Sequence, residues 1–228
     1  MKFFARLTPN ETVFGFIYFL LQLLIIPGMM LAVNTMLTLS VSEAVINFIF
    51  FAINFLVVIV IFRKFLRENL QVLRAYPRNI LHCAGIGLVI YMVGNSIFGF
   101  LITMFFPDFS NINDAAIMEM VQGHFGLMTI GTVLFVPLAE ECFYRGLIFR
   151  NFYDKHPIGA YALSMVIFSL AHVLGYVTMI DFGTLVLCFF QYLPAGFALA
   201  WSYRKSGSIF ASVLIHMAVN QTGMLLMR

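Results

Sequence analysis

The sequence predicts an all-α, polytopic membrane helical bundle of about seven transmembrane helices, with six to eight allowed. Of its 228 residues, 62% are hydrophobic and only 10% are charged, whereas about a quarter of the residues in a typical soluble domain are charged. Several uncharged windows reach the roughly 20 apolar residues that a helix needs to cross the hydrocarbon core. We therefore expect a single membrane domain over residues 1–228.

Each predicted span is an uncharged window between charged or turn-forming residues. The first window follows Lys2 and Arg6 like a signal peptide, but it lacks a small-residue cleavage site, so a retained anchor is expected. A re-entrant or interfacial stretch around 109–123 would change the count by one. The predicted spans are 13–37, 44–62, 80–106, 124–150, 158–178, 183–203 and 208–227.

The basic residues indicate an orientation. With a cytoplasmic N-terminus, all of the 13 Lys and Arg residues except Arg228 fall on inner segments, as the positive-inside rule requires. The formal net charge of +3 then reflects topology, and nucleic-acid binding is not expected. The basic segment 63–79 is predicted to be an amphipathic cytoplasmic helix that attracts anionic membrane lipids, while 107–123 is predicted to be outside and irregular at Pro107-Asp108.

The run Glu140-Glu141-Cys142-Phe143-Tyr144-Arg145 contains the first candidate residues. Carboxylates at membrane depth are costly, so they are functional candidates by default. Glu141 and Arg145 are four residues apart and share a helix face. Glu140 lies about 100° around the helix and has no basic residue four positions away, which suits a general base. Pro137 is expected to kink this helix.

Two later spans supply the other candidates, His172 on one and His216 with Asn220 on the other. His216 and Asn220 are four apart and therefore project from one face. At 1.5 Å per residue, Glu140 lies about 15 Å from Arg150, His216 about 16 Å from Lys205 and His172 about 21 Å from Ile158, all on the cytoplasmic side. These similar depths predict one polar cluster near the bilayer midplane, reached from the cytoplasm.

The three motifs, in this order on separate spans, resemble those of the CPBP intramembrane protease family. The quoted patterns are Glu140-Glu141-x-x-x-Arg145, Phe168-x-x-x-His172 and His216-x-x-x-Asn220. That family includes type II CAAX prenyl endopeptidases and bacterial bacteriocin-processing or self-immunity membrane proteins. The resemblance covers about residues 124–224, the region expected to carry the catalytic motifs, and the spans before it contribute only hydrophobicity.

The resemblance implies a glutamate-type intramembrane endopeptidase. Glu140, together with His172, would activate a water molecule, and Glu141, held by Arg145, would help to position the site. His216 and Asn220 would donate hydrogen bonds to the tetrahedral oxyanion. Phe168 is expected to be a packing residue. No cofactor is expected.

Three alternatives stay open. Two histidines and a carboxylate suit zinc with an open fourth position, although no His-Glu-x-x-His is present and Asn220 fits an oxyanion site better. The cluster would otherwise stabilise a non-catalytic immunity or regulatory scaffold protein. A transporter with a proton-coupled carboxylate pair is the third alternative.

The expected substrate is a membrane-associated peptide or a lipidated protein. The chain has no evident soluble recognition domain, so selection must come from the cavity and its entrances. The expected location is the plasma membrane of a bacterium, with the N-terminus inside and the C-terminus outside. Neither the substrate nor the oligomeric state follows from the sequence.

Overall fold

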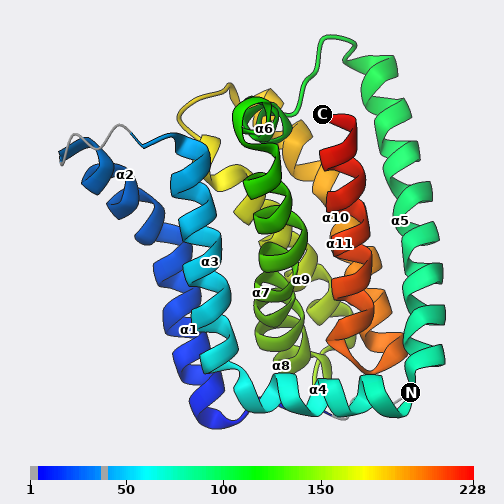
Figure 1. Cartoon of the computed structure of the whole chain (residues 1–228). Coiled ribbons are helices and arrows are strands. Elements are labelled where there is room, and N and C mark those ends of the chain that lie inside the picture. The colour runs from blue at the N-terminus through cyan, green and yellow to red at the C-terminus, as the bar shows by residue number, and fades with distance from the viewer. Residues whose placement is uncertain (1–4, 37–40) are drawn as a thin grey trace.

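The computed structural model describes residues 5–36 and 41–228, and its regular elements in these ranges are helices (Figure 1). Two segments, η1 and η2, are π-helical and one, η3, is a 3₁₀-helix. The elements are α1 Pro9–Leu24, α2 Ile26–Met36, α3 Glu43–Ile61, α4 Arg63–Ala75, α5 Pro77–Phe105, α6 Ile112–Thr129, η1 Ile130–Phe135, α7 Val136–Glu141, η2 Cys142–Phe149, α8 Arg150–Tyr153, α9 Pro157–Val173, η3 Leu174–Tyr176, α10 Phe182–Ser206 and α11 Ile209–Leu226.

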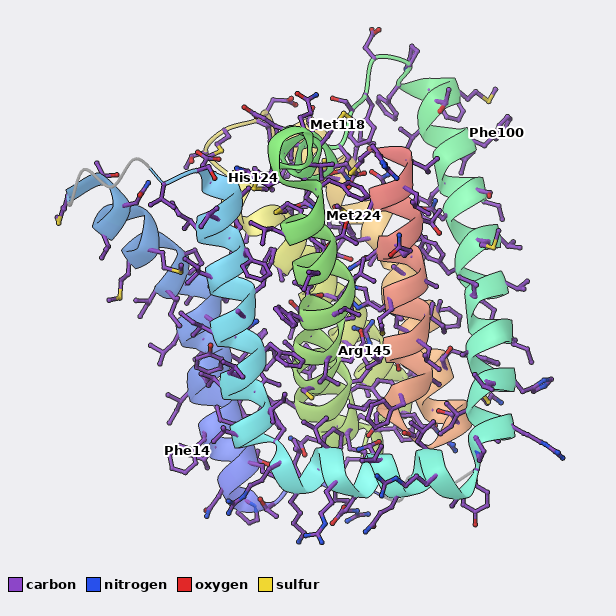
Figure 2. All side chains as sticks on the ribbon, viewed as in Figure 1. Phe14, Phe100, Met118, His124, Arg145 and Met224 are labelled. Carbon is purple, nitrogen blue, oxygen red and sulfur yellow. The ribbon has the colours of Figure 1, made fainter. Side chains whose placement is uncertain are left out.

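The helices of the described residues are those of a polytopic membrane protein. Six helical runs are long and apolar enough to cross a membrane, and the bent pair α1–α2 raises the number to seven. The all-α bundle of about seven spans predicted above is therefore confirmed. Large apolar side chains such as Phe14 and Phe100, 58% and 68% exposed, point outward (Figure 2), as residues that face lipid do.

The first predicted span, 13–37, differs from the structure. Helix α1 begins earlier, at Pro9, because Thr8 and Glu11 form a capping box. The helix then breaks at Ile25, and α2 continues at an angle of 49°. Pro27 explains the break because it lacks the N–H that would bond to the carbonyl one turn back. The predicted end at residue 37 lies outside the described residues.

The run from α6 to α8 is longer than the predicted span 124–150. It is helical from Ile112 to Tyr153, with Asn111 capping the first turn. His124 has non-helical angles, φ −141° and ψ 40°, and marks a kink. Figure 1 shows the part of α6 before this kink almost end-on, lying across the end of the bundle, while the later part runs along it. The chain is irregular at Pro107-Asp108, as expected, and becomes helical from Ile112, so that most of the 109–123 stretch is a helix lying across the end of the bundle.

The two ends of the bundle differ in charge. Helix α4 lies across one end, which we call the basic end (Figure 1). The other end, beside the first part of α6, is called the acidic end. Lys2, predicted to lie with the basic group, is outside the described residues. The basic end carries Arg6, Arg63, Lys64, Arg67, Arg74, Arg78, Arg150, Lys155, Arg204 and Lys205, and the acidic end carries Glu43, Asp108, Asp114, Glu119, Asp181 and Arg228.

The largest packed core fills the basic half of the bundle. All eight residues of η2 are buried, and they pack with side chains from α3, α4 and α10. Without a strong hydrophobic force between helices in lipid, such close packing is what holds the bundle together. The largest fully buried apolar side chains of this core include Phe62, Phe65, Phe143, Leu147, Phe149 and Tyr203.

Helix α4 also fixes the start of α11, which carries two candidate residues. The buried Asn69 side chain accepts a hydrogen bond from the Ile209 N–H at 2.9 Å, and Ser208 Oγ donates to the Asn69 carbonyl at 3.3 Å. The chain reverses before α11 through Gly207, whose φ of 77° suits glycine. The axial position of α11 is therefore set at the basic end.

Candidate active site

Both glutamates lie between two π-helical segments. The Val136 N–H bonds to the Gly131 carbonyl, five residues back, and the helix widens again from Cys142 to Phe149. Such π-turns are rare in proteins, and those that occur often lie at functional sites. The helix continues through Pro137, and the kink that was expected at this proline lies instead at His124.

Glu141 lies at the centre of a buried ionic cluster. Its side chain is 0% exposed. Its Oε1 accepts a hydrogen bond from Arg145 Nη1 at 3.2 Å and lies 3.0 Å from His216 Nδ1. Arg145 Nε is 3.2 Å from Oε2, an ion-pair distance without hydrogen-bond alignment, and Nη2 donates to the Gly196 carbonyl at 3.2 Å. Glu141 is thus held on both sides.

Glu140 has a different environment. Its side chain is 21% exposed and lines a cavity, and its Oε2 has no hydrogen-bond partner among the described residues. The nearest basic group is His216 Nε2, 3.9 Å from Oε2. An unsatisfied carboxylate oxygen is costly unless water or a ligand supplies a donor. Glu140 is therefore the carboxylate available to a molecule in the cavity.

His216 connects the two carboxylates. An ionised carboxylate only accepts hydrogen bonds, so the short contact to Glu141 places the proton of a neutral His216 on Nδ1. Its Nε2 then presents a lone pair on the side of Glu140. This tautomer is inferred from the hydrogen-bond partners. Glu141 and Arg145 consequently fix both the orientation and the free nitrogen of His216.

His172 lines the same cavity but has different partners. Its Nδ1 donates to the Phe168 carbonyl at 2.8 Å, since a carbonyl oxygen can only accept. Its ring stacks on Tyr192, with 4.3 Å between ring centroids. Among the described residues, His216 rather than His172 is the histidine beside Glu140. The expected pairing of Glu140 with His172 is therefore not present as a direct contact.

Asn220 satisfies a backbone carbonyl that the helix leaves open. Its Nδ2 donates to the Thr132 carbonyl at 2.8 Å. In an α-helix the Val136 N–H would bond there, but it bonds to Gly131; in a π-helix the donor would come from residue 137, which is a proline without an N–H. Asn220 also lines the cavity, and its amide nitrogen retains a second hydrogen.

Phe168 does more than fill space. It is 2% exposed, and Arg145 Cζ lies 4.7 Å from its ring centroid, within cation–π range. The rings of His172 and His216 lie 4.5 and 6.0 Å from it. Phe168 therefore joins the ionic cluster to both histidines, a role that sequence reasoning reduced to packing.

The cavity has a volume of about 830 Å³ and runs from Glu140 toward the acidic end. At that end it is lined by Asn113 and Asp114 of the first part of α6, by Tyr176 and by Thr222. No described residue of α4, α8 or the turn before α11 lines it. An entrance from the cytoplasmic side, taken as the basic end, was expected, but the cavity extends toward the other end, because the packed core occupies the basic half of the bundle.

A hydrogen-bonded network borders the cavity at the acidic end. Asn111 Nδ2 donates to Gln191 Oε1 at 2.8 Å, and Asn113 Nδ2 donates to Tyr192 Oη at 3.1 Å. The Tyr176 hydroxyl donates to Asn113 Oδ1 at 3.3 Å. These bonds fasten the start of α6 to η3 and to α10. Tyr192 of α10 in turn stacks on His172. Sequence reasoning missed Tyr192 and Thr132 because an isolated tyrosine or a backbone carbonyl gives no motif.

The residues present do not fit a zinc site. Among the described residues, no group of three His, Cys, Asp or Glu side chains is placed to hold a metal ion. The nearest candidates are Glu140, Glu141 and His216. However, Glu141 Oε1 and His216 Nδ1 already bond to each other, and Glu141 Oε2 is paired with Arg145. A cation there would have to displace the buried guanidinium.

Comparison with known proteins identifies a family domain that covers less than half of the chain. Residues 122–222 match the family model described as type II CAAX prenyl endopeptidase Rce1-like. Residues 122–222 form an Rce1-like domain. The match confirms the resemblance drawn from the motifs, and the Rce1-like domain contains Glu140, Glu141, Arg145, His172, His216 and Asn220.

One curated relative extends the comparison. The chain is 31% identical over 90 residues to UPF0177 protein YxdF of Lactococcus lactis subsp. lactis (strain IL1403), which is 40% of this chain and 44% of that protein. The chain therefore matches less than half of the length of this relative. No solved structure gives a significant match. Helices α1–α5 lie outside the Rce1-like domain, and all of them except α4 contribute to the walls of its cavity, through residues such as Gln22, Asn54 and Asn95.

Proposed function

We propose that the protein is a glutamate-type intramembrane endopeptidase that hydrolyses a peptide bond of a membrane-associated or lipidated polypeptide. The observation that carries this proposal is the contrast between the two glutamates. Glu141 is paired with Arg145 and held by His216, while the Glu140 side chain lines the cavity and its Oε2 has no hydrogen-bond partner among the described residues. The Rce1-like family of the domain supports the same reaction class.

Water activation follows from the hydrogen-bonding groups around Glu140. The Glu140 carboxylate and the lone pair of His216 Nε2 both accept hydrogen bonds, and His216 Nε2 lies 3.9 Å from Glu140 Oε2, so in this proposal a water molecule in the cavity donates to the carboxylate beside His216. As the water oxygen bonds to the substrate carbonyl carbon, Glu140 accepts a proton and the carbonyl becomes an oxyanion. Transfer of a proton to the amide nitrogen then breaks the C–N bond and releases a carboxyl and an amine.

In this proposal the remaining residues orient His216 and stabilise the oxyanion. Glu141 and Arg145 keep His216 in place, and the water proton, once Glu140 has passed it to His216 Nε2, lets His216 donate to the oxyanion before that proton moves to the amide nitrogen. The second amide hydrogen of Asn220 is a further donor, although the first is committed to the Thr132 carbonyl. A correctly placed oxyanion donor typically lowers a barrier by about 3–4 kcal/mol. His172 lines the cavity with its Nε2 unpaired among the described residues and contacts the substrate in this proposal.

The decisive variant is Glu140→Gln, compared with Glu119→Gln, an exposed carboxylate outside the cavity. We expect Glu140→Gln to lower cleavage by about 10²–10⁴-fold, the usual contribution of a general base. Because Glu140 Oε2 has no protein donor to lose, the thermal unfolding temperature of this variant in detergent should match that of Glu119→Gln. Full cleavage by Glu140→Gln would refute the assignment.

Two further outcomes separate the alternatives. If a cell phenotype of the wild type survives in folded Glu140→Gln and His172→Ala variants, the protein acts as a scaffold or immunity factor without proteolysis. If purified active protein contains stoichiometric zinc whose removal stops cleavage, the reaction is metal-dependent and the arrangement around Glu141 must change when zinc binds.

A further inference from the structure

The cavity ends near the middle of the bundle. The lining residues nearest to the basic end are Tyr144 of η2, Leu199 of α10 and Ile215 of α11. Immediately beyond them, Arg145, Leu147, Phe149 and Tyr203 are 0% exposed. Packed interiors contain few voids larger than a water molecule, so this layer separates Glu140 from the basic end.

Toward the acidic end the cavity continues. Its lining residues extend along α11 from Ile215 to Met227, and along α6 they include Asn113, Asp114, Ile117 and Met120. The four α6 residues lie on one face of the part that crosses the end of the bundle (Figure 1), as their spacing requires. Figure 2 shows the same order of depth, with Arg145 lying below Met224 and Met118 nearest the acidic end. A polypeptide that follows the cavity from the acidic end to Glu140 therefore passes the first part of α6.

The charges at the two ends of the bundle indicate which end faces the cytoplasm. The basic end carries the described lysines and arginines that lie at helix ends, with the exception of Arg228. Lys and Arg in short loops concentrate on the cytoplasmic side of membrane proteins. Helix α4 adds the interfacial amphipathic pattern typical of a surface facing anionic lipid. The basic end therefore faces the cytoplasm by this rule, and the cavity opens on the opposite face.

We infer that the proposed protease is entered from the non-cytoplasmic side and cleaves membrane-anchored or exported polypeptides in the outer half of the membrane or just outside it. This inference rests on the proposed function for the cleavage step, whereas the direction of entry rests on the extent of the cavity and on the distribution of basic residues. A prenylated C-terminus in the cytoplasm would have to cross the packed core to reach Glu140, so such a substrate does not fit this geometry.

The cavity wall also restricts the chemistry of the substrate. Its described acidic residues are Asp114 and Glu140, and none of its described residues is lysine or arginine. Asp114 has no ion-pair partner among the described residues. An uncompensated carboxylate near the entrance favours cations and repels anions. We expect apolar segments flanked by neutral or basic residues to enter, and acidic segments to be excluded.

Cysteine labelling tests the direction of entry independently of catalysis. The wild type sets the background because Cys83, Cys142 and Cys188 are buried. Ala195→Cys places a thiol on the cavity wall, Lys155→Cys reports the basic end and Asp181→Cys the acidic end. In intact bacterial cells, a membrane-impermeant maleimide should label Asp181→Cys and Ala195→Cys but not Lys155→Cys, and inside-out vesicles should reverse this pattern.

Three labelling results would overturn the inference: labelling of Ala195→Cys only from the side of Lys155→Cys, no labelling of Ala195→Cys from either side, or labelling of Lys155→Cys in intact cells. None of them bears on whether Glu140 is catalytic.

Mapping new termini in membrane proteins tests the substrate. Membranes from cells that produce the wild type are compared with membranes from cells that produce Glu140→Gln, and each Glu140-dependent cleavage site is placed relative to the spans of its protein. We expect sites in outer halves of spans or on outer flanks, preceded or followed by few acidic residues. Sites confined to cytoplasmic flanks would overturn the direction of entry, whereas the absence of Glu140-dependent sites would overturn the proposed protease function itself.

Discussion

Glu140 and Glu141 are adjacent in sequence, yet the side chain of one is 21% exposed and that of the other is 0% exposed. Desolvating a carboxylate costs several kcal/mol unless opposite charges and hydrogen bonds replace the water. Glu141 obtains both from Arg145 and His216, and Glu140 does not. Glu141 therefore holds the geometry of the site, while Glu140 has no such structural bonds and is available to react.

Arg145→Met should destabilise the protein strongly because it leaves Glu141 buried without its counter-charge. Breaking a buried pair from one side typically costs about 3–5 kcal/mol, whereas replacing both partners by apolar residues is often neutral. We therefore expect Arg145→Met to lower the unfolding temperature in detergent far more than the double variant Glu141→Leu/Arg145→Met. Both should lose cleavage because His216 is no longer held. Equal destabilisation of the single and double variants would contradict this reading of the pair.

The sequence predicted the Glu141–Arg145 contact because residues four apart on a helix are neighbours whatever the tertiary structure. It also indicated similar depths for the three helices. It did not show that His216, and not His172, lies beside Glu140, because that depends on the rotation of α9 and α11 about their axes. Glu11 was missed as well, although Thr8-Pro9-Asn10-Glu11 has the spacing of a capping box.

At the scale of the helix, the wide turn before Glu140 explains why Asn220 is needed. The π-turn diverts the Val136 N–H to Gly131 and Pro137 supplies no donor, so the Thr132 carbonyl depends on a side chain from α11. One hydrogen bond thereby ties the helix of the glutamates to the helix of His216. A proline that was expected to bend the helix instead creates a binding point for its neighbour.

Pro137→Ala should make Asn220 less important for stability because it restores an N–H five residues after Thr132. Asn220→Leu alone leaves that carbonyl unsatisfied and should cost about 1–3 kcal/mol. In the Pro137→Ala background the same change should cost less, with a coupling of at least about 0.5 kcal/mol. Unfolding of the four proteins in one detergent provides the double-mutant cycle. Strictly additive effects would show that Asn220 does not compensate for the proline.

The spans were predictable where a long apolar window ends at charges, as for α3, which was expected at 44–62 and runs from Glu43 to Ile61. Two features were not. The break at Ile25 lies inside an uninterrupted apolar window, in which Pro27 was the only signal. The first part of α6 contains Asp114 and Glu119 and follows Pro107-Asp108, so it reads as a loop, while the Asn111 cap and contacts with α10 make it a helix.

At the scale of the molecule, Glu11 joins the first helix to the helix that lies across the basic end. Its Oε1 accepts hydrogen bonds from the Lys64 and Phe65 N–H groups, both at 2.9 Å, and its Oε2 accepts from Thr8. A carboxylate at the start of α4 also complements the helix dipole. One buried side chain thus caps two helices and holds α1 against the bundle.

Glu11→Ala should therefore lower the free energy of unfolding by more than the loss of one hydrogen bond would, because N–H groups at the starts of two helices lose their acceptor. Each such group costs about 1–3 kcal/mol. The matched control is Glu68→Ala on α4, a partly exposed carboxylate 4.0 Å from Lys64, whose loss should cost about 0–1 kcal/mol. Thermal unfolding compares the two, and limited proteolysis should cut near residues 5–11 only in Glu11→Ala. Equal stability of both variants would contradict the role of Glu11.

The packed half of the bundle has an electrical consequence. A membrane that stores energy as an ion gradient cannot tolerate a continuous column of water, yet hydrolysis requires water at Glu140. In this fold the cavity beside Glu140 ends before the buried Arg145, and the core around Phe65, Phe149 and Tyr203 fills the remainder of the path to the basic end. Most of the transmembrane voltage should then fall across that dry layer, and Glu140 should exchange protons with the compartment at the acidic end. The acidity of that compartment, and not that of the other, would govern the rate of cleavage.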